Sequence, residues 1–183
     1  MEWSTTCSVL NKVRGLENSP CENQQVIFIQ EAFPGGAPPG EEAPMLTGYV
    51  SYVHYTRRGL ITYIHSSIPH TLLGSSAQVD MTFQLFEITV GNGTLRLCNV
   101  YSAPGVINLP VLPIPTDSGM IYMGDFNARH PALGDSSSTP NRGSKPLLDY
   151  IRRYRLTRRD IGGATHARGG YCRSHSHSWP CGT

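Results

Sequence analysis

Two polar residues with catalytic potential, Asp125 and Asn127, follow an apolar run at positions 120–123. The run has the composition of a strand buried on both faces, and the polar residues come where that strand should end. A strand end can hold side chains rigidly beside a cleft, where a carboxylate binds a metal or accepts a proton and a carboxamide hydrogen-bonds a phosphate oxygen. The alternative is an ordinary Asp/Asn turn after a strand.

A second carboxylate, Glu31, stands at the end of another apolar segment, 25–30, which predicts a buried central strand. A glutamate there is costly to bury unless a cation or a hydrogen bond meets it; the alternative is an exposed residue at a strand end. Asn99 and Tyr101 stand two residues apart near the end of a third predicted strand, so their side chains share one face. The alternative role of Tyr101 is to anchor that strand end through its polar tip.

The elements that must position these residues are mostly strands. Alternating polarity predicts strands over 49–55 and 81–90. A turn follows each of them, and we expect the chain to return as a strand over 60–64 and over 94–101. The ranges 81–90 and 94–101 are joined by Gly91–Gly93, whose Asn-Gly pair is typical of a hairpin turn. One side of strand 81–90 is expected to carry Met81, Phe83, Leu85 and Glu87.

The second half of the chain predicts a loop and a helix. Residues 131–142 are polar and rich in Gly, Ser and Pro, which indicates a loop. A helix is predicted over 144–156, with Ser144 as its N-cap. Its apolar stripe consists of Leu147, Leu148, Ile151 and Tyr154.

Composition limits the class of protein. A length of 183 residues suits one domain, and a net charge of +2 is too small to indicate a nucleic-acid partner by itself. Positive charge is concentrated after position 141, where it either follows a phosphate backbone or lies on a solvated helix face and tail. The residues are Arg142, Lys145, Arg152, Arg153, Arg155, Arg158, Arg159, Arg168 and Arg173. Five cysteines without framework spacing indicate reduced thiols and an intracellular protein, and we expect neither a signal peptide nor a membrane span.

Six short segments, in this order, resemble the endonuclease/exonuclease/phosphatase superfamily with the DNase-I-like fold. The similarity is greatest to the apurinic-type endonuclease domain of non-LTR retrotransposons. The segments are Gln30-Glu31; 58–64 running on to Ser67-Ile68-Pro69-His70; 97–104; Gly124-Asp125-Phe126-Asn127-Ala128; Asn141-Arg142-Gly143; and Ala164-Thr165-His166. The resemblance implies an α/β (α+β) fold: a four-layer sandwich in which two packed mixed β-sheets are flanked by helices.

The resemblance also implies a reaction, the Mg²⁺-dependent (or Mn²⁺-dependent) hydrolysis of DNA phosphodiesters that nicks a target site. Glu31 would hold the metal, and Asp125 would orient or deprotonate the attacking water. Asn127 and Tyr101 would bind phosphate oxygens, with Asn99 in support. The residues expected to face DNA are Asn141, Arg142, Thr165 and His166. DNA is the expected partner, and the sequence indicates no membrane and no obligate protein partner.

The resemblance breaks near the C-terminus. The family continues with two strands ending in Ser-x-Ile-Asp and Ser-Asp-His, and neither motif occurs after His166. We therefore expect an incomplete domain over 1–170 that lacks the last strands, a non-homologous tail over 171–183, and impaired activity. Four side chains of the types that bind zinc lie within ten residues, but they are too closely spaced for a usual zinc site. They are Cys172, His175, His177 and Cys181. Two alternatives stay open: a small-molecule phosphatase or phosphodiesterase of the same fold, and a non-catalytic DNA-binding fragment.

Overall fold

A computed structural model of the chain describes residues 25–33, 44–56, 58–78, 80–105, 107–115, 119–133 and 139–157. The chain divides into two compact units, and the boundary falls between Asn127 and Ala128. All the described strands belong to the first unit, and the α-helix of the described residues belongs to the second. The predicted domain end at residue 170 and the tail over 171–183 lie outside the described residues and stay predictions.

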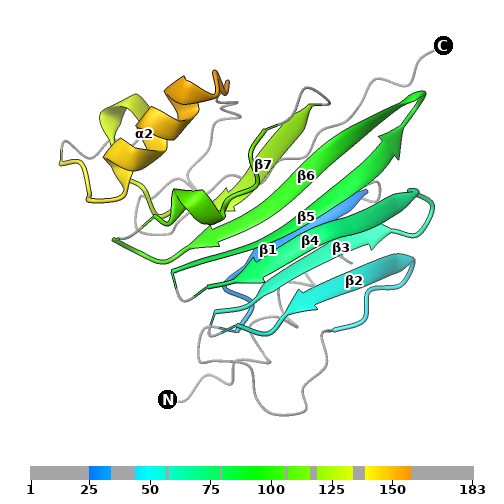
Figure 1. Cartoon of the computed structure of the whole chain (residues 1–183). Coiled ribbons are helices and arrows are strands. Elements are labelled where there is room, and N and C mark those ends of the chain that lie inside the picture. Colours follow the sequence, from blue (N-terminus) through cyan, green and yellow to red (C-terminus); the bar gives the residue numbers. More distant parts are fainter. Residues whose placement is uncertain are drawn as a thin grey trace, which may run out of the picture. The chain divides into compact units, whose positions relative to one another are not determined.

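The first sheet of unit 1 has three antiparallel strands in the order β1-β3-β2 (Figure 1). The strands are β1 (Val26–Gln30), β2 (Tyr49–His54) and β3 (Leu60–His65). The first five residues of β3 are fully buried, since a strand in the middle of a covered sheet has both faces shielded. The prediction that 25–30 form the central strand is wrong, because among the described strands β1 pairs with β3 alone.

The second sheet has four strands in the order β4-β5-β6-β7. They are β4 (His70–Ala77), β5 (Met81–Val90), β6 (Gly93–Ser102) and β7 (Met120–Asp125). The sheet is mixed, because β6 and β7 run parallel while the other pairs are antiparallel. The predicted hairpin joins β5 to β6. The prediction that 120–123 are buried on both faces is wrong, because β7 pairs with β6 alone among the described strands and leaves Ile121 37% exposed.

The two sheets of unit 1 pack face to face. Their facing side chains form a core cluster to which both sheets contribute; its buried members are Ile64, Ile68, Phe86, Ile88 and Leu97. The buried side of β5 is made of Thr82, Gln84, Phe86 and Ile88. The side predicted for β5, with Phe83, Leu85 and Glu87, is therefore the half-buried one, although Met81 is buried. The two sides of this strand are similarly apolar, so the burial of Thr82 and Gln84 is not evident from the sequence.

The predicted α/β sandwich of two packed sheets is confirmed, with one sheet mixed and the other antiparallel throughout. Unit 2 contains the helix α2 (Ser144–Arg153), which buries Ser144, Leu147 and Leu148. Ser144 is the first helical residue and not the N-cap as predicted; Gly143 is the cap, and the Ser144 hydroxyl donates to the Asn141 carbonyl at 2.7 Å. No helix in the described ranges is long and apolar enough to cross a membrane.

Candidate active site

The side chains of Glu31 and Tyr101 meet at the ends of the strands of unit 1. Glu31 directly follows β1, and Tyr101 is the penultimate residue of β6. The Tyr101 hydroxyl donates a hydrogen bond to Glu31 Oε1 at 2.8 Å, although the two residues are 70 positions apart. Tyr101 lies opposite Asp125 in the parallel β6–β7 ladder. Three of the predicted site residues thus come from three neighbouring strand ends.

Asp125 and Asn127 form a tight turn that is fixed by hydrogen bonds. The Asn127 amide donates to Asp125 Oδ1 at 2.8 Å, and the Asn127 carboxamide nitrogen donates to the Ser102 carbonyl at 2.8 Å. Asn127 itself adopts a left-handed backbone, with φ of 47°, which asparagine tolerates better than most residues. The turn therefore holds Asp125 and Asn127 in one arrangement beside the end of β6.

Gly124 makes this arrangement possible. Its φ is 146°, and a Cβ built on it would lie 1.8 Å from the Val100 carbonyl oxygen on β6. A side chain at this position would push β7 away from β6, because that contact is with backbone and cannot swing aside. The glycine of the Gly-Asp-Phe-Asn segment thus sets the distance at which Asp125 stands beside Tyr101.

Asn99 lies deeper than the other predicted residues. It is fully buried between the sheets, where its Oδ1 accepts from Gln30 Nε2 at 2.7 Å and its Nδ2 donates to Thr62 Oγ1 at 3.0 Å and to the Ile61 carbonyl at 3.3 Å. Gln30 immediately precedes Glu31. The support expected from Asn99 is therefore structural in this arrangement, since it fixes the end of β1 and does not reach the surface.

Arg58 is a member of the site to which the sequence had assigned no role. Its Nη1 donates to Glu31 Oε1 at 3.0 Å, the same oxygen that accepts from Tyr101. The Arg58 carbonyl accepts from the Phe33 amide at 2.9 Å, and the Gly59 carbonyl accepts from the Ala32 amide at 3.2 Å. The turn before β3 is thereby attached to the residues that follow Glu31, and this contact across 27 positions has no local sequence signal.

Electrostatics keep Tyr101 a hydrogen-bond donor. Burial, followed by the hydrogen bond to Glu31 and the negative charge of Glu31, raises the pKa of Tyr101 well above its ordinary value. The charge of Asp125 acts in the same direction and that of Arg58 opposes it. The raised pKa keeps the Tyr101 phenol protonated, so that it can donate a hydrogen bond. The Glu31 backbone has a positive φ of 50°, a conformation that residues other than glycine rarely adopt. Backbone strain of this kind is common at functional sites.

The donors present fit a hard cation of the Mg²⁺ type. The Glu31 side chain is 38% exposed, and its hydrogen bonds within the described residues go to Oε1, which leaves Oε2 for a ligand. Mg²⁺ commonly uses one or two carboxylates and completes its shell with water and phosphate oxygens. The described residues hold no group of three or more His, Cys, Asp or Glu side chains that would favour a protein-enclosed metal.

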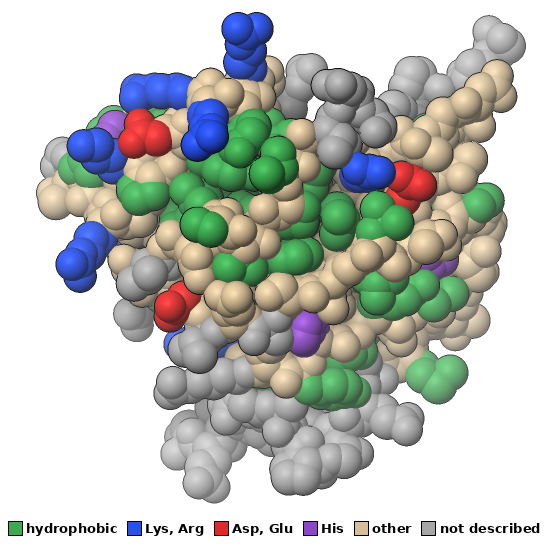
Figure 2. All heavy atoms as spheres, viewed as in Figure 1, with side chains coloured by type: hydrophobic (Ala, Val, Ile, Leu, Met, Phe, Trp, Pro, Cys, Tyr) green, Lys and Arg blue, Asp and Glu red, His purple; other side chains and the backbone are tan. Residues whose placement is uncertain are grey.

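The predicted DNA-facing residues belong to unit 2. Asn141 closes the loop that starts at Arg129: its Oδ1 accepts from the Arg129 amide and its own amide donates to the Arg129 carbonyl, both at 3.0 Å. Arg142 is exposed at the start of this unit's helical segment. Thr165 and His166 lie outside the described residues. Lys and Arg side chains gather over α2 in Figure 2, and the exposed ones are Arg142, Lys145, Arg152, Arg153 and Arg155.

Comparison with solved structures relates the fold to a nuclease. The chain is similar to the crystal structure of the AP endonuclease LMAP from Leishmania major, with a TM-score of 0.55 and 15% sequence identity. The match covers 81% of this chain, and it spans only 63% of the length of that protein. No family model and no curated protein matches the sequence. The similarity establishes a shared fold with this AP endonuclease, and that fold is the one that the motif resemblance implies.

Proposed function

We propose that this chain is a DNA endonuclease that hydrolyses phosphodiesters with the help of Mg²⁺ or Mn²⁺. The observation that carries the proposal is the convergence of Glu31, Tyr101 and Asp125 at neighbouring strand ends, on a fold shared with an AP endonuclease. The order of the motifs along the chain supports a more specific proposal, a target-site nicking domain of a non-LTR retrotransposon. A reverse-transcriptase coding segment downstream in the encoding DNA would support this origin, and its absence from intact loci would count against it.

The proposed roles are those that the family resemblance implies, and the partners of each residue support them. Glu31 would hold the cation, which supplies polarisation of the phosphoryl oxygen and neutralises charge on the leaving oxygen. Asp125, fixed by the Asn127 amide, would accept a proton from the attacking water. Asn127, anchored to the Ser102 carbonyl, would present its carboxamide to a phosphate oxygen. The Tyr101 hydroxyl donates its hydrogen bond to Glu31 here and would donate it to a phosphate oxygen on binding.

The turnover of this chain is a separate part of the proposal. The family resemblance requires a Ser-Asp-His segment whose histidine stabilises or protonates the phosphate, and this sequence contains none. Loss of such a group costs on the order of 10²–10⁴ in rate. We therefore expect the remaining active-site residues to support only slow nicking. The proposed DNA substrate and the cysteine spacing, which is typical of reduced thiols, support an intracellular location. Fractionation of cells expressing the chain would test this proposal.

The decisive assay is nicking of supercoiled plasmid in Mg²⁺, with EDTA and Asp125→Ala as negative controls. A sharper comparison uses two glutamates, because Glu31 and Glu87 each pair with one arginine and have similarly exposed side chains, at 38% and 32%. We expect Glu31→Gln to abolish nicking and Glu87→Gln to leave it unchanged. Nicking that survives EDTA or Asp125→Ala would contradict the proposed site. If a folded protein leaves DNA intact but hydrolyses bis(p-nitrophenyl) phosphate, the substrate class is wrong.

A further inference from the structure

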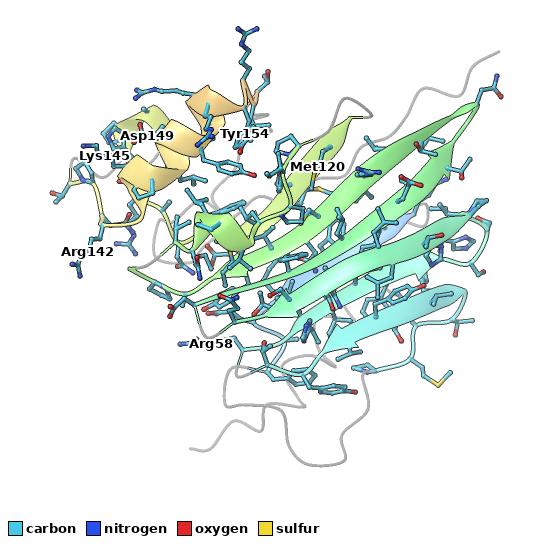
Figure 3. All side chains as sticks on the ribbon, viewed as in Figure 1. Arg58, Met120, Arg142, Lys145, Asp149 and Tyr154 are labelled. Atoms are coloured by element: carbon cyan, nitrogen blue, oxygen red, sulfur yellow. The ribbon has the colours of Figure 1, made fainter. Side chains whose placement is uncertain are left out.

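Arg58 offers the site far more hydrogen-bonding capacity than the protein uses. A guanidinium carries five N–H donors, and only Nη1 has a partner among the described residues, namely Glu31 Oε1. The Arg58 side chain is 43% exposed, so its other donors are accessible to a ligand. Figure 3 shows Arg58 at the turn before β3. A charged group with spare donors therefore stands beside the carboxylate proposed to hold the cation.

The Arg58 backbone is held in place while its side chain is held weakly. Gly59 has φ of +70°, and a Cβ on it would lie 2.2 Å from the Phe33 ring, so the turn packs closely against the segment after Glu31. The two backbone hydrogen bonds from Ala32 and Phe33 attach the turn to that segment. Within the described residues the side chain, in contrast, makes one hydrogen bond, to an oxygen that it shares with Tyr101. Arginine–carboxylate pairs frequently use both carboxylate oxygens instead.

We propose that Arg58 is a phosphate-binding residue that pairs with Glu31 in the free protein and with a phosphate oxygen of the DNA strand in the complex. This inference rests on the proposed function. We call this change of partner, from Glu31 to phosphate, the exchange. It has an electrostatic cause, because a cation held by Glu31 would repel the Arg58 guanidinium and the phosphate would attract it. Arginine suits this role because its planar donors match phosphate oxygens and its charge persists at every working pH.

The exchange predicts that one substitution changes two affinities in opposite directions. Arg58→Ala removes a positive charge beside Glu31, so Mn²⁺ should bind about two- to fivefold more tightly in the absence of DNA, the range expected for a partly exposed pair. The same substitution removes a phosphate contact, so DNA should bind about tenfold more weakly, and the slope of log K against log salt should fall by about one. A residue that only maintained the shape of the site would weaken both affinities when removed.

The test measures each affinity apart from turnover. Mn²⁺ binding is followed by electron paramagnetic resonance of the protein without DNA. Binding of a fluorescent duplex is followed by anisotropy in Mn²⁺ at several salt concentrations, with wild-type and substituted Arg58 compared in an Asp125→Ala background that prevents nicking. Arg58→Lys keeps the charge without the planar donors and should give Mn²⁺ binding like wild type with an intermediate loss of DNA affinity. Arg96→Ala is the matched control, because Arg96 also pairs with a glutamate at 3.2 Å but lies five residues before Tyr101 on β6. It should change neither affinity.

The outcomes separate this inference from the proposed function. If wild type binds and nicks DNA while Arg58→Ala binds it equally well, only the role of Arg58 is overturned. If Arg58→Ala loses Mn²⁺ and DNA affinity together while Arg58→Lys restores both, the arginine positions Glu31 and does not bind phosphate. If wild type binds neither DNA nor Mn²⁺ in a cooperatively folded state, the proposed function and the inference both fail.

Discussion

Asn99→Ala tests whether the buried polar network holds the end of β1. The substitution removes the acceptor of Gln30 Nε2 and the donor to both Thr62 Oγ1 and the Ile61 carbonyl. Thr62 is fully buried and keeps its bond to Gln84 Oε1 at 2.7 Å, so the main loss falls on Gln30, whose donor is left without that partner. A buried polar group left unpaired costs about 1–3 kcal/mol, and each hydrogen bond lost costs about 1 kcal/mol. We expect a loss of about 2–4 kcal/mol in the free energy of unfolding.

Urea unfolding measures this loss. With a slope of roughly 2 kcal/mol per molar urea, typical of small proteins, the midpoint should fall by about 1–2 M without a change in slope. Asn108→Ala is a matched control, because Asn108 also bonds one glutamine side chain, Gln78, but at an exposed position. It should move the midpoint by less than about 0.3 M, since surface changes usually cost under 0.5 kcal/mol. Equal midpoints for the two variants would refute the reasoning that burial gives the Asn99 network its strength.

Three further predictions concern the site and its supports. Tyr101→Phe should reduce nicking at least about tenfold while the melting temperature changes little, because the hydrogen bond to Glu31 is lost at a half-exposed carboxylate. Gly124→Ala should lower the melting temperature by more than about 5 °C because its Cβ meets the Val100 carbonyl, whereas Gly74→Ala, with no atom within 4 Å of its Cβ, should not. Burial raises the pKa of Tyr63 to about 12, so its protonated form stabilises the fold fully below pH 10, and this contribution is lost as the pH rises from 10 to 12. The difference in unfolding free energy between wild type and Tyr63→Phe should therefore shrink over that interval; a difference that stays constant would contradict the argument.

The sequence predicts those parts of the fold whose signals are local. Alternating polarity located β2 and β5, and the turns after them located β3 and β6 as returning strands. The strand β4 was not predicted, because its sequence HTLLGSSA is small and polar, and both Leu72 and Leu73 are exposed by 40% or more. Periodicity identifies a strand only where burial differs between its two faces, and this strand lacks that contrast.

In the candidate site, too, residues with a local sequence signal were predicted, and residues placed by long-range contacts were not. Glu31, Tyr101 and Asp125 are candidates from the sequence because each chemical group stands at the end of an apolar strand, and the structure brings the three together. The depth of Asn99 and the involvement of Arg58 were not recognisable, because both depend on contacts between residues far apart in the chain. The order of strands also decides burial: β1 and β7 have apolar sequences typical of central strands, yet each has one described neighbour.

The position of these two strands affects how the site responds to partial denaturation. Each of them has one neighbour among the described strands, and edge strands open at a lower free energy than central ones, so their amides should exchange with deuterium faster. Glu31 and Asp125 adjoin β1 and β7, whereas Tyr101 lies on the doubly paired strand β6. The two carboxylates should therefore separate from Tyr101 while the centre of both sheets remains protected. Mild urea would then inactivate the protein at concentrations where its circular dichroism is still native.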